Sequence, residues 1–569
     1  NARPLIEGRG RGNGIAFRLT PAEPIIAFQK FHFVDNSDWI YLHKNMRVYA
    51  NVDMDSEDGL CFRMQSDRSD TVSLQNINLE LIRFRLDKLS GILPYMPRIT
   101  GLFSAEANYI QTATSLQVSA EAGVEKLTYE RQPVGNIGLG ATWLPGDKGT
   151  HYLNAYFRSG DQEVLTADAV LTQKNGRDSL EVNTTFEHFP LSLANAFMPD
   201  QVVTFTGDID GGLYINGDME KPKMSGDLSL DSVSVYARQA GARYWFDNRP
   251  LKIENNQLIF NKFAIYTTSR NPFTIDGNVD FRNMDRPTAN LTLRAQNYTL
   301  LDAPRTRESM LYGKIFVDLN ATVRGPLDGL TMRGNMNLLG NTDVTYVLTD
   351  SPLTVEDRLG ELVTFTSFTD TTSVQATEVP TMSLGGMDML MSVHIDDAVR
   401  LRADLSPDRS SRVELEGGGD LNLQYTPQGD LTLSGRYTLI GGMMKYALPV
   451  IPLKEFQFVN GSYVDWTGNP MNPSLNLTAT ERVRASVSDG DDGGSRMVNF
   501  DVSISIKNRL ENPDLSFNLS APEDATVQGE LAGMSADERS KQAITMLATG
   551  MYLYNSGKGG GLTMGSALN

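Results

Sequence analysis

Apolar and polar residues alternate at every second position through much of this chain. Residues 475–480 read Leu-Asn-Leu-Thr-Ala-Thr, and residues 502–507 read Val-Ser-Ile-Ser-Ile-Lys. Successive side chains of a β-strand point to opposite faces of its sheet, so each stretch predicts a strand with one apolar and one polar face. Polar outward faces argue against a parallel βαβ architecture, whose strands are buried on both sides. The same alternation recurs at 291–295, 421–425, 431–433, 456–458 and 515–519.

A longer repeat lies over this alternation. An apolar stretch, a proline and a strand that begins with glycine occur near residues 84–105 and again near 189–213. The two copies are offset by about 105 residues, which indicates repeating structural units rather than separate globular domains.

Few segments have helical spacing. Residues 86–96 and 191–198 each predict one or two turns that end before a proline, and residues 355–363 predict another short piece. Near the end, Ser535 and Glu538 form a Ser-x-x-Glu capping box. The apolar residues that follow recur with helical spacing up to Met551. We therefore predict a repetitive β-structure over 1–534, then an amphipathic helix and a glycine-rich tail over 535–569.

Composition limits the possible partners. The net charge is −18, so nucleic acid is an unfavourable partner. Apolar residues make up 40% of the 569 and there are 50 glycines, which suits an ordered chain with many turns. No run of 18 apolar residues predicts a membrane-spanning helix. The chain starts without Met or a leader, so we expect a fragment whose anchor lies outside it.

We find no catalytic or metal-binding arrangement in the sequence. The five histidines are widely spaced, and Cys61 is the only cysteine. Residues 489–494 lack the spacing of a calcium loop. Gly557-Lys558-Gly559 lacks both the first glycine and the final Ser/Thr of a phosphate loop. We expect a protein that is not an enzyme and that has no cofactor.

Three stretches in the last third resemble a known family. Residues 435–442 read Gly-Arg-Tyr-Thr-Leu-Ile-Gly-Gly, residues 465–470 read Asp-Trp-Thr-Gly-Asn-Pro, and residues 512–517 read Asn-Pro-Asp-Leu-Ser-Phe. This pattern resembles the C-terminal domain of the TamB family, the translocation and assembly module proteins of Gram-negative envelopes. The match covers roughly 400–569, with only looser strand repeats upstream.

The resemblance implies an all-β fold: an elongated half-open β-groove (β-taco) of stacked strands, related to AsmA-like and bridge-like lipid-transfer proteins. It also implies a periplasmic protein that is anchored in the inner membrane and works with an outer-membrane barrel of the TamA/BamA type. Alternation alone also fits stacked β-sandwiches, in which the apolar face meets a second sheet. The repeat, the scarcity of helices and the resemblance together favour the groove.

Three functions follow from this interpretation. The first is a hydrophobic groove that carries phospholipid acyl chains between the membranes. The second is an assembly or translocation factor for outer-membrane proteins, and the third is a passive structural protein. The sequence leaves open the lipid cargo, the direction of transport and the barrel partner. The expected groove residues are Leu291, Leu293, Leu421, Leu423, Leu431, Leu433, Phe456, Phe458, Leu475, Leu477, Val502, Ile504, Ile506, Leu515, Phe517 and Leu519. The expected partner-binding residues are Ile544, Leu547 and Met551.

Overall fold

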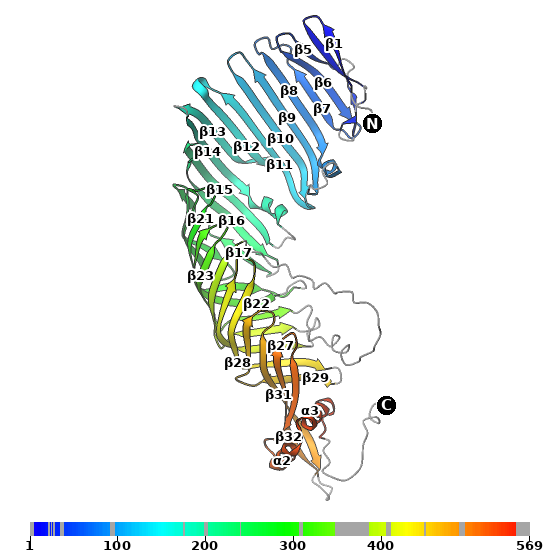
Figure 1. The fold of residues 1–569 in the computed structure, drawn as a ribbon, viewed down its shortest axis with the longest axis vertical. Coiled ribbons are helices and arrows are strands. Elements are labelled where there is room, and N and C mark those ends of the chain that lie inside the picture. Colours follow the sequence, from blue (N-terminus) through cyan, green and yellow to red (C-terminus); the bar gives the residue numbers. More distant parts are fainter. Residues whose placement is uncertain are drawn as a thin grey trace. The chain divides into compact units, whose positions relative to one another are not determined.

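Antiparallel pairing between strands that follow one another in sequence builds most of the structure, a computed structural model (Figure 1). It describes residues 5–20, 23, 25–26, 29–34, 39–91, 97–174, 177–198, 203–238, 241–306, 311–347, 386–404, 411–448, 451–488 and 495–552. These form two compact units. The first consists mainly of residues 1–288 and the second mainly of 289–569, except that 239–242 and 267–274 belong to the second unit.

The first unit contains twenty strands and three short 3₁₀ helices among its described residues. They are β1 Leu5–Arg11, β2 Gly14–Thr20, β3 Ile25–Ile26, β4 Gln29–Phe33, β5 Trp39–His43, β6 Val48–Ser56, β7 Cys61–Ser66, β8 Gln75–Arg85, η1 Leu86–Gly91, β9 Ile99–Gln111, β10 Leu116–Tyr129, β11 Gln132–Pro145, η2 Asp147–Gly149, β12 Thr150–Ser159, β13 Gln162–Lys174, β14 Arg177–Pro190, η3 Leu191–Phe197, β15 Val203–Asp218, β16 Lys223–Ala237, β17 Ala242–Phe246, β18 Leu251–Glu254, β19 Gln257–Tyr266 and β20 Phe273–Asp280. From β8 to β16 each strand pairs antiparallel with the next.

Among its described residues, the second unit contains the remaining strands and two α-helices. They are β21 Thr288–Ala303, β22 Leu311–Pro326, β23 Thr331–Leu338, β24 Asp343–Val347, β25 Asp388–Ile395, β26 Arg400–Asp404, β27 Arg412–Tyr425, β28 Leu431–Leu448, β29 Ile451–Phe458, β30 Tyr463–Gly468, β31 Ser474–Ser488, β32 Ser495–Arg509, β33 Asp514–Ser520, α2 Ala525–Gly533 and α3 Ala536–Thr549. Two pairings in this unit, β23 with β25 and β24 with β26, are parallel. The remaining pairings described between its strands are antiparallel.

The all-β class predicted from the alternation is confirmed. Every alternating stretch identified in the sequence lies within a strand. Two of the expected short helices are present as η1 and η3, whereas the piece expected at 355–363 lies outside the described residues. The capping box of α3 forms as predicted, because Ser535 Oγ accepts the N–H of Glu538 and Glu538 accepts the N–H of Ser535.

Helix α2 was not expected from the sequence. Asp524 caps its first turn by accepting the N–H groups of Thr526 and Val527. An N-cap residue that precedes an apolar residue was the available signal. The helix has only a weak apolar stripe, so the usual 3.6-residue periodicity does not reveal it.

Candidate functional site

The register of the strands shows which side chains share a face in the first unit. Residues directly opposite each other on paired strands lie on the same side of the sheet. Tracing these partners from β9 to β13 places five alanines in one continuous row. The row consists of Ala107, Ala120, Ala141, Ala155 and Ala167.

Larger apolar side chains flank this alanine row on both sides. One neighbouring row runs through Leu81, Ala105, Ala122, Leu139, Phe157, Leu165 and Phe186. The other runs through Ile77, Tyr109, Val118, Trp143, Leu153, Ala169 and Val182. We call the side of β8–β14 that carries these three rows the apolar face.

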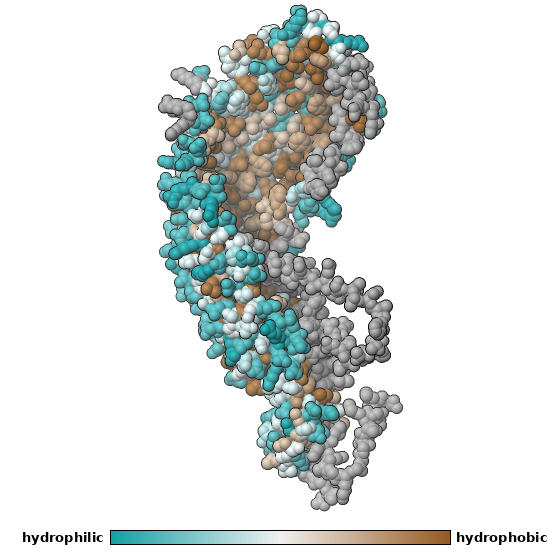
Figure 2. Space-filling view, in the orientation of Figure 1, coloured by the Kyte–Doolittle hydropathy of each residue, from teal (hydrophilic) through white to brown (hydrophobic). Residues whose placement is uncertain are grey.

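The chain itself leaves the apolar face largely uncovered. Among the described residues of β8–β14, only Val164 and Ala169 are buried hydrophobic side chains, and of these only Ala169 belongs to the three rows. Leu139, next to the alanine row, is 56% exposed, and Leu79 is 38% exposed. Figure 2 shows hydrophobic side chains gathered over these strands. A monomeric soluble protein rarely exposes a contiguous apolar surface of this kind unless another molecule binds there.

The opposite face of the same strands is polar and charged. Glu80 lies opposite Glu106, and Glu106 lies opposite Glu121, which places three carboxylates on neighbouring strands. Arg158 pairs with Glu121 at one end of this row. At the other end, Arg63 lies 3.2 Å from Asp53 and 3.5 Å from Glu80. The hydrogen bond with Asp53 holds the pKa of Arg63 above its ordinary value.

In the second unit, the apolar sides of many strands are buried. Its strands and the two helices share one buried cluster, in which Phe500, Leu531 and Met546 are fully buried. Helix α3 packs against β29, β32 and β33. The apolar side of these strands therefore contacts the chain's own side chains.

Most of the groove residues expected from the sequence lie in this buried cluster. Leu421, Phe456, Phe458, Leu477, Val502, Ile504 and Leu519 belong to the cluster as buried members. Leu293, Leu423, Leu433, Leu475, Ile506, Leu515 and Phe517 pack against it while partly buried. Leu291 is half-buried and Leu431 is 46% exposed. An acyl chain would reach the buried seven only after α3 or neighbouring strands moved.

The three expected partner-binding residues of the last helix lie in different environments. Leu547 is buried, Ile544 is partly buried against the cluster, and Met551 is 53% exposed just beyond the helix. Of the three, Met551 is the most accessible to a partner in this conformation.

One polar pair interrupts the apolar side of the second unit. Glu481 lies opposite Val502, and one of its oxygens is 3.5 Å from Lys454 Nζ. Its other oxygen, Oε2, is buried without a hydrogen-bond partner. Burial raises the pKa of this carboxyl group above its ordinary value, against the attraction of Lys454.

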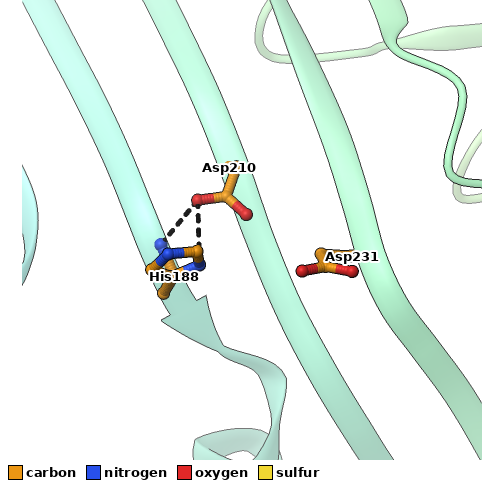
Figure 3. Close-up of side chains that lie close together, drawn as sticks. All are labelled: His188, Asp210 and Asp231. Atoms are coloured by element: carbon orange, nitrogen blue, oxygen red, sulfur yellow. Dashed lines mark hydrogen bonds and ion pairs between the residues drawn. The ribbon is translucent and has the colours of Figure 1, made fainter.

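The polar side of the first unit carries a group of potential metal ligands (Figure 3). One ligand atom each from His188, Asp210 and Asp231 lies within 4.8 Å of the others. The three residues come from the neighbouring strands β14, β15 and β16. The Asp210 carboxylate already interacts with His188. Its Oδ1 atom accepts the backbone N–H of His188 at 2.7 Å and lies 3.4 Å from the Nδ1 atom of the imidazole. The His188 and Asp210 side chains are 63% and 28% exposed, so we assign no ion to this group.

The sequence prediction missed the apolar face of the first unit, and a signal for it was present. Residues 103–109, 118–124 and 137–143 each alternate apolar residues with polar residues or glycine, and alanine or leucine stands on each side of the central residue. Alanine and glycine make this alternation weak on a hydropathy scale. The downstream stretches carry larger apolar residues and therefore a stronger alternation. Those stretches pack in the buried cluster of the second unit.

Fold and face together define the class: a β-sheet protein that presents, over part of its length, an apolar side uncovered by its own chain. A family model of the TamB C-terminal domain matches residues 261–569, more than half of the chain. The chain belongs to the TamB family, and is thus an envelope protein of a transport and assembly module. The match starts within β19, so the apolar face lies upstream of it. No curated protein matches the chain. No described helix has the length and apolar character needed to cross a membrane.

Proposed function

We propose that this protein carries phospholipid between the inner and outer membranes, with the acyl chains held against the apolar face. The uncovered face on β8–β14 is the observation that supports this most directly. We further propose that the chain lies in the periplasm, that an inner-membrane anchor lies outside this sequence, and that a TamA/BamA-type barrel is its partner.

The free-energy costs favour transfer of lipid along a protein surface over diffusion of lipid through water. Exposing a 16-carbon acyl chain to water costs about 12 kcal/mol at roughly 0.8 kcal/mol per methylene. A barrier of about 20 kcal/mol for a two-chain lipid permits only about 0.01 transfers per second. Contact with an uncovered apolar sheet removes much of that barrier without any bond chemistry. A passive track sets no direction, which must come from a gradient or a partner.

Charges placed on the alanine row test this proposal. We expect Ala141→Asp with Ala155→Asp to slow phospholipid transfer between donor and acceptor vesicles on the order of tenfold or more, because a carboxylate there must be desolvated beside hydrocarbon. The matched control is Thr142→Asp with Asn154→Asp. These residues lie opposite each other on the polar face of the same two strands. Equal transfer by both folded double variants would refute the proposal.

A second proposed function is assembly of outer-membrane proteins. Its support is the exposed Met551 beside α3, together with the family assignment. A photo-crosslinker at Met551 should then capture a barrel protein in cells. The same crosslinker at Met219, which is equally exposed at 53% in the turn after β15, provides the comparison. Capture from neither position, or from both alike, would count against a specific docking site.

A further inference from the structure

We propose that phospholipids lie across the apolar face in one orientation, with headgroups at the edge that carries Trp143 and His151 and tails toward the edge that carries Phe103 and Phe157. This inference rests on the proposed function and adds the position of the headgroup. It follows from a chemical difference between the two edges of the face.

The first edge carries side chains with apolar bodies and polar tips, and we call it the polar-tipped edge. The Tyr109 hydroxyl donates to Gln111 Oε1 at 3.2 Å. Trp143 stacks on His151 with ring centroids 5.3 Å apart and planes at 22°. These residues precede or follow the turns at 112–115 and 146–149. The Nδ1 atom of His151 is buried and has no hydrogen-bond partner in the protein.

The second edge carries mainly phenylalanine rings, with Tyr129 beside Phe197 at its outer end, and we call it the phenylalanine edge. Phe84 lies directly opposite Phe103. Phe189 contacts both Phe186 and Phe157, with ring centroids 5.9 and 6.0 Å apart. The phenylalanine rings can contact acyl chains but can neither donate nor accept a conventional hydrogen bond.

The distance between the two edges fits an acyl chain. Phe103 and Tyr109 are six residues apart on β9, which is about 20 Å along a strand. The hydrocarbon of one bilayer leaflet is about 15 Å thick, half of the roughly 30 Å core. A tail that lies along the strands therefore covers about three-quarters of the distance between the two edges, and the headgroup adds to that reach.

The polar-tipped edge also indicates the class of lipid. Tryptophan and tyrosine favour the boundary between hydrocarbon and water because each joins an apolar ring to a hydrogen-bonding group. The Trp143 indole N–H and the His151 imidazole offer donors to ester and phosphate oxygens. The expected substrate is a two-chain glycerophospholipid, whose headgroup supplies those acceptors, rather than a bare hydrocarbon.

Tryptophan quenching in the full chain tests the orientation. One reporter keeps Trp143 and carries Trp39→Phe, Trp245→Phe and Trp466→Phe. The other carries Trp39→Phe, Trp143→Tyr, Trp245→Phe and Trp466→Phe together with Phe103→Trp, so that position 143 keeps an aromatic ring with a polar tip. Each is titrated with phosphatidylcholine that bears a nitroxide either on the choline headgroup or near the methyl end of one acyl chain.

We expect the headgroup label to quench Trp143 about threefold more than the tail label does, and the reverse at position 103, because the sites lie about 20 Å apart. Stronger quenching of Trp143 by the tail label, or equal responses at both sites, would overturn the orientation but leave lipid binding intact. If neither label quenches either reporter, the proposed function itself fails.

Two controls separate orientation from simple proximity. Thr142→Trp in the tryptophan-free background reports the polar face of β11 and should respond to neither label. In the Phe103→Trp reporter, Trp143→Leu in place of Trp143→Tyr, together with His151→Leu, removes the polar tips at positions 143 and 151. The two labels should then quench position 103 about equally, within about twofold, because lipids can lie either way round. Retention of the original preference would show that Trp143 and His151 do not set the orientation.

Discussion

At the residue scale, the sheets depend on backbone positions that side chains of neighbouring strands stabilise. Five described residues other than glycine combine a positive φ with a backbone N–H that donates to a side chain on the next strand. The pairs are Arg83 with Ser104, Lys126 with Asn136, His188 with Asp210, Lys262 with Asp276, and Asn297 with Asp318. Register shifts mark β-bulges at the first three. A bulge bends its strand and increases the local twist.

The Lys126 bulge provides a direct test of this account. Its φ is 52° and its N–H donates to Asn136 Oδ1 at 2.8 Å. We expect Lys126→Val to lower the free energy of unfolding by about 1–2 kcal/mol, because a branched side chain opposes a positive φ. The free energy of unfolding of Lys126→Gly should equal or exceed that of the wild type. Asn136→Ala should cost about 1 kcal/mol. Urea denaturation measures all three, and equal stability of the Val and Gly variants would contradict a strained bulge.

Glu481 should make the stability of the second unit depend on pH. Burial raises its pKa in the folded state above the ordinary value, so the folded chain binds a proton that the unfolded chain has already released. Stability then falls as pH rises from the ordinary carboxyl pKa through the raised one. Glu481→Gln removes this dependence, so the stability of the variant relative to wild type should improve between pH 4.5 and pH 8. The control is Glu511→Gln, an exposed carboxylate of the same unit that accepts a hydrogen bond from Asn472. An identical pH profile for wild type and Glu481→Gln would exclude this role.

At the element scale, strands with the same alternation occupy two different environments. Leu139 on β11 is 56% exposed, whereas Leu439 on β28 is fully buried. We expect Leu439→Ala to lower the free energy of unfolding by about 2–5 kcal/mol through the cavity it leaves. Leu139→Ala should change it by less than about 1 kcal/mol. Chemical denaturation followed by circular dichroism compares the two. A similar cost at both positions would mean that the apolar face is covered in solution.

The repeat in the sequence has a physical counterpart in its glycines. Gly101, Gly207 and Gly313 follow one another at intervals of 106 residues, and all three have positive φ values, of 143°, 89° and 114°. A Cβ atom on Gly207 would lie 2.6 Å from the backbone of Ser232, and one on Gly313 would lie 2.3 Å from the Asp343 oxygen. Only glycine lets the neighbouring backbones approach so closely. This explains why a strand that begins with glycine recurs.

At the scale of the whole molecule, the uncovered surface belongs to the first unit and the buried cluster to the second. Photo-incorporation of a hydrophobic dye such as bis-ANS should therefore label peptides from 97–174 more heavily than peptides from 411–448 or 495–520, because dyes of this kind bind exposed apolar surface. Peptide mapping by mass spectrometry measures the ratio. Excess phospholipid should reduce labelling of the first set. Predominant labelling of the second set would place the accessible surface elsewhere.

Much of the local structure could be predicted from the sequence. Strand identity, the short helices η1 and η3, and the capping box of α3 all depend on nearby residues, which is why their patterns were readable. The candidate site was predicted less well. Leu477, Val502 and Ile504 were expected to face an open groove, yet they lie in the buried cluster. Their alternation is the same as that of residues on the apolar face of the first unit.

By itself, the sequence determined which side of each strand is apolar, since a period of two assigns alternate residues to opposite faces whatever the fold around them. Only the tertiary structure decided which apolar sides remain uncovered. That outcome depends on what arrives from far along the chain: α2 and α3 help bury Phe500 and Leu519, whereas no described element buries Leu139. Burial depends on which residues are neighbours in space, and the residues of a strand do not by themselves specify those neighbours.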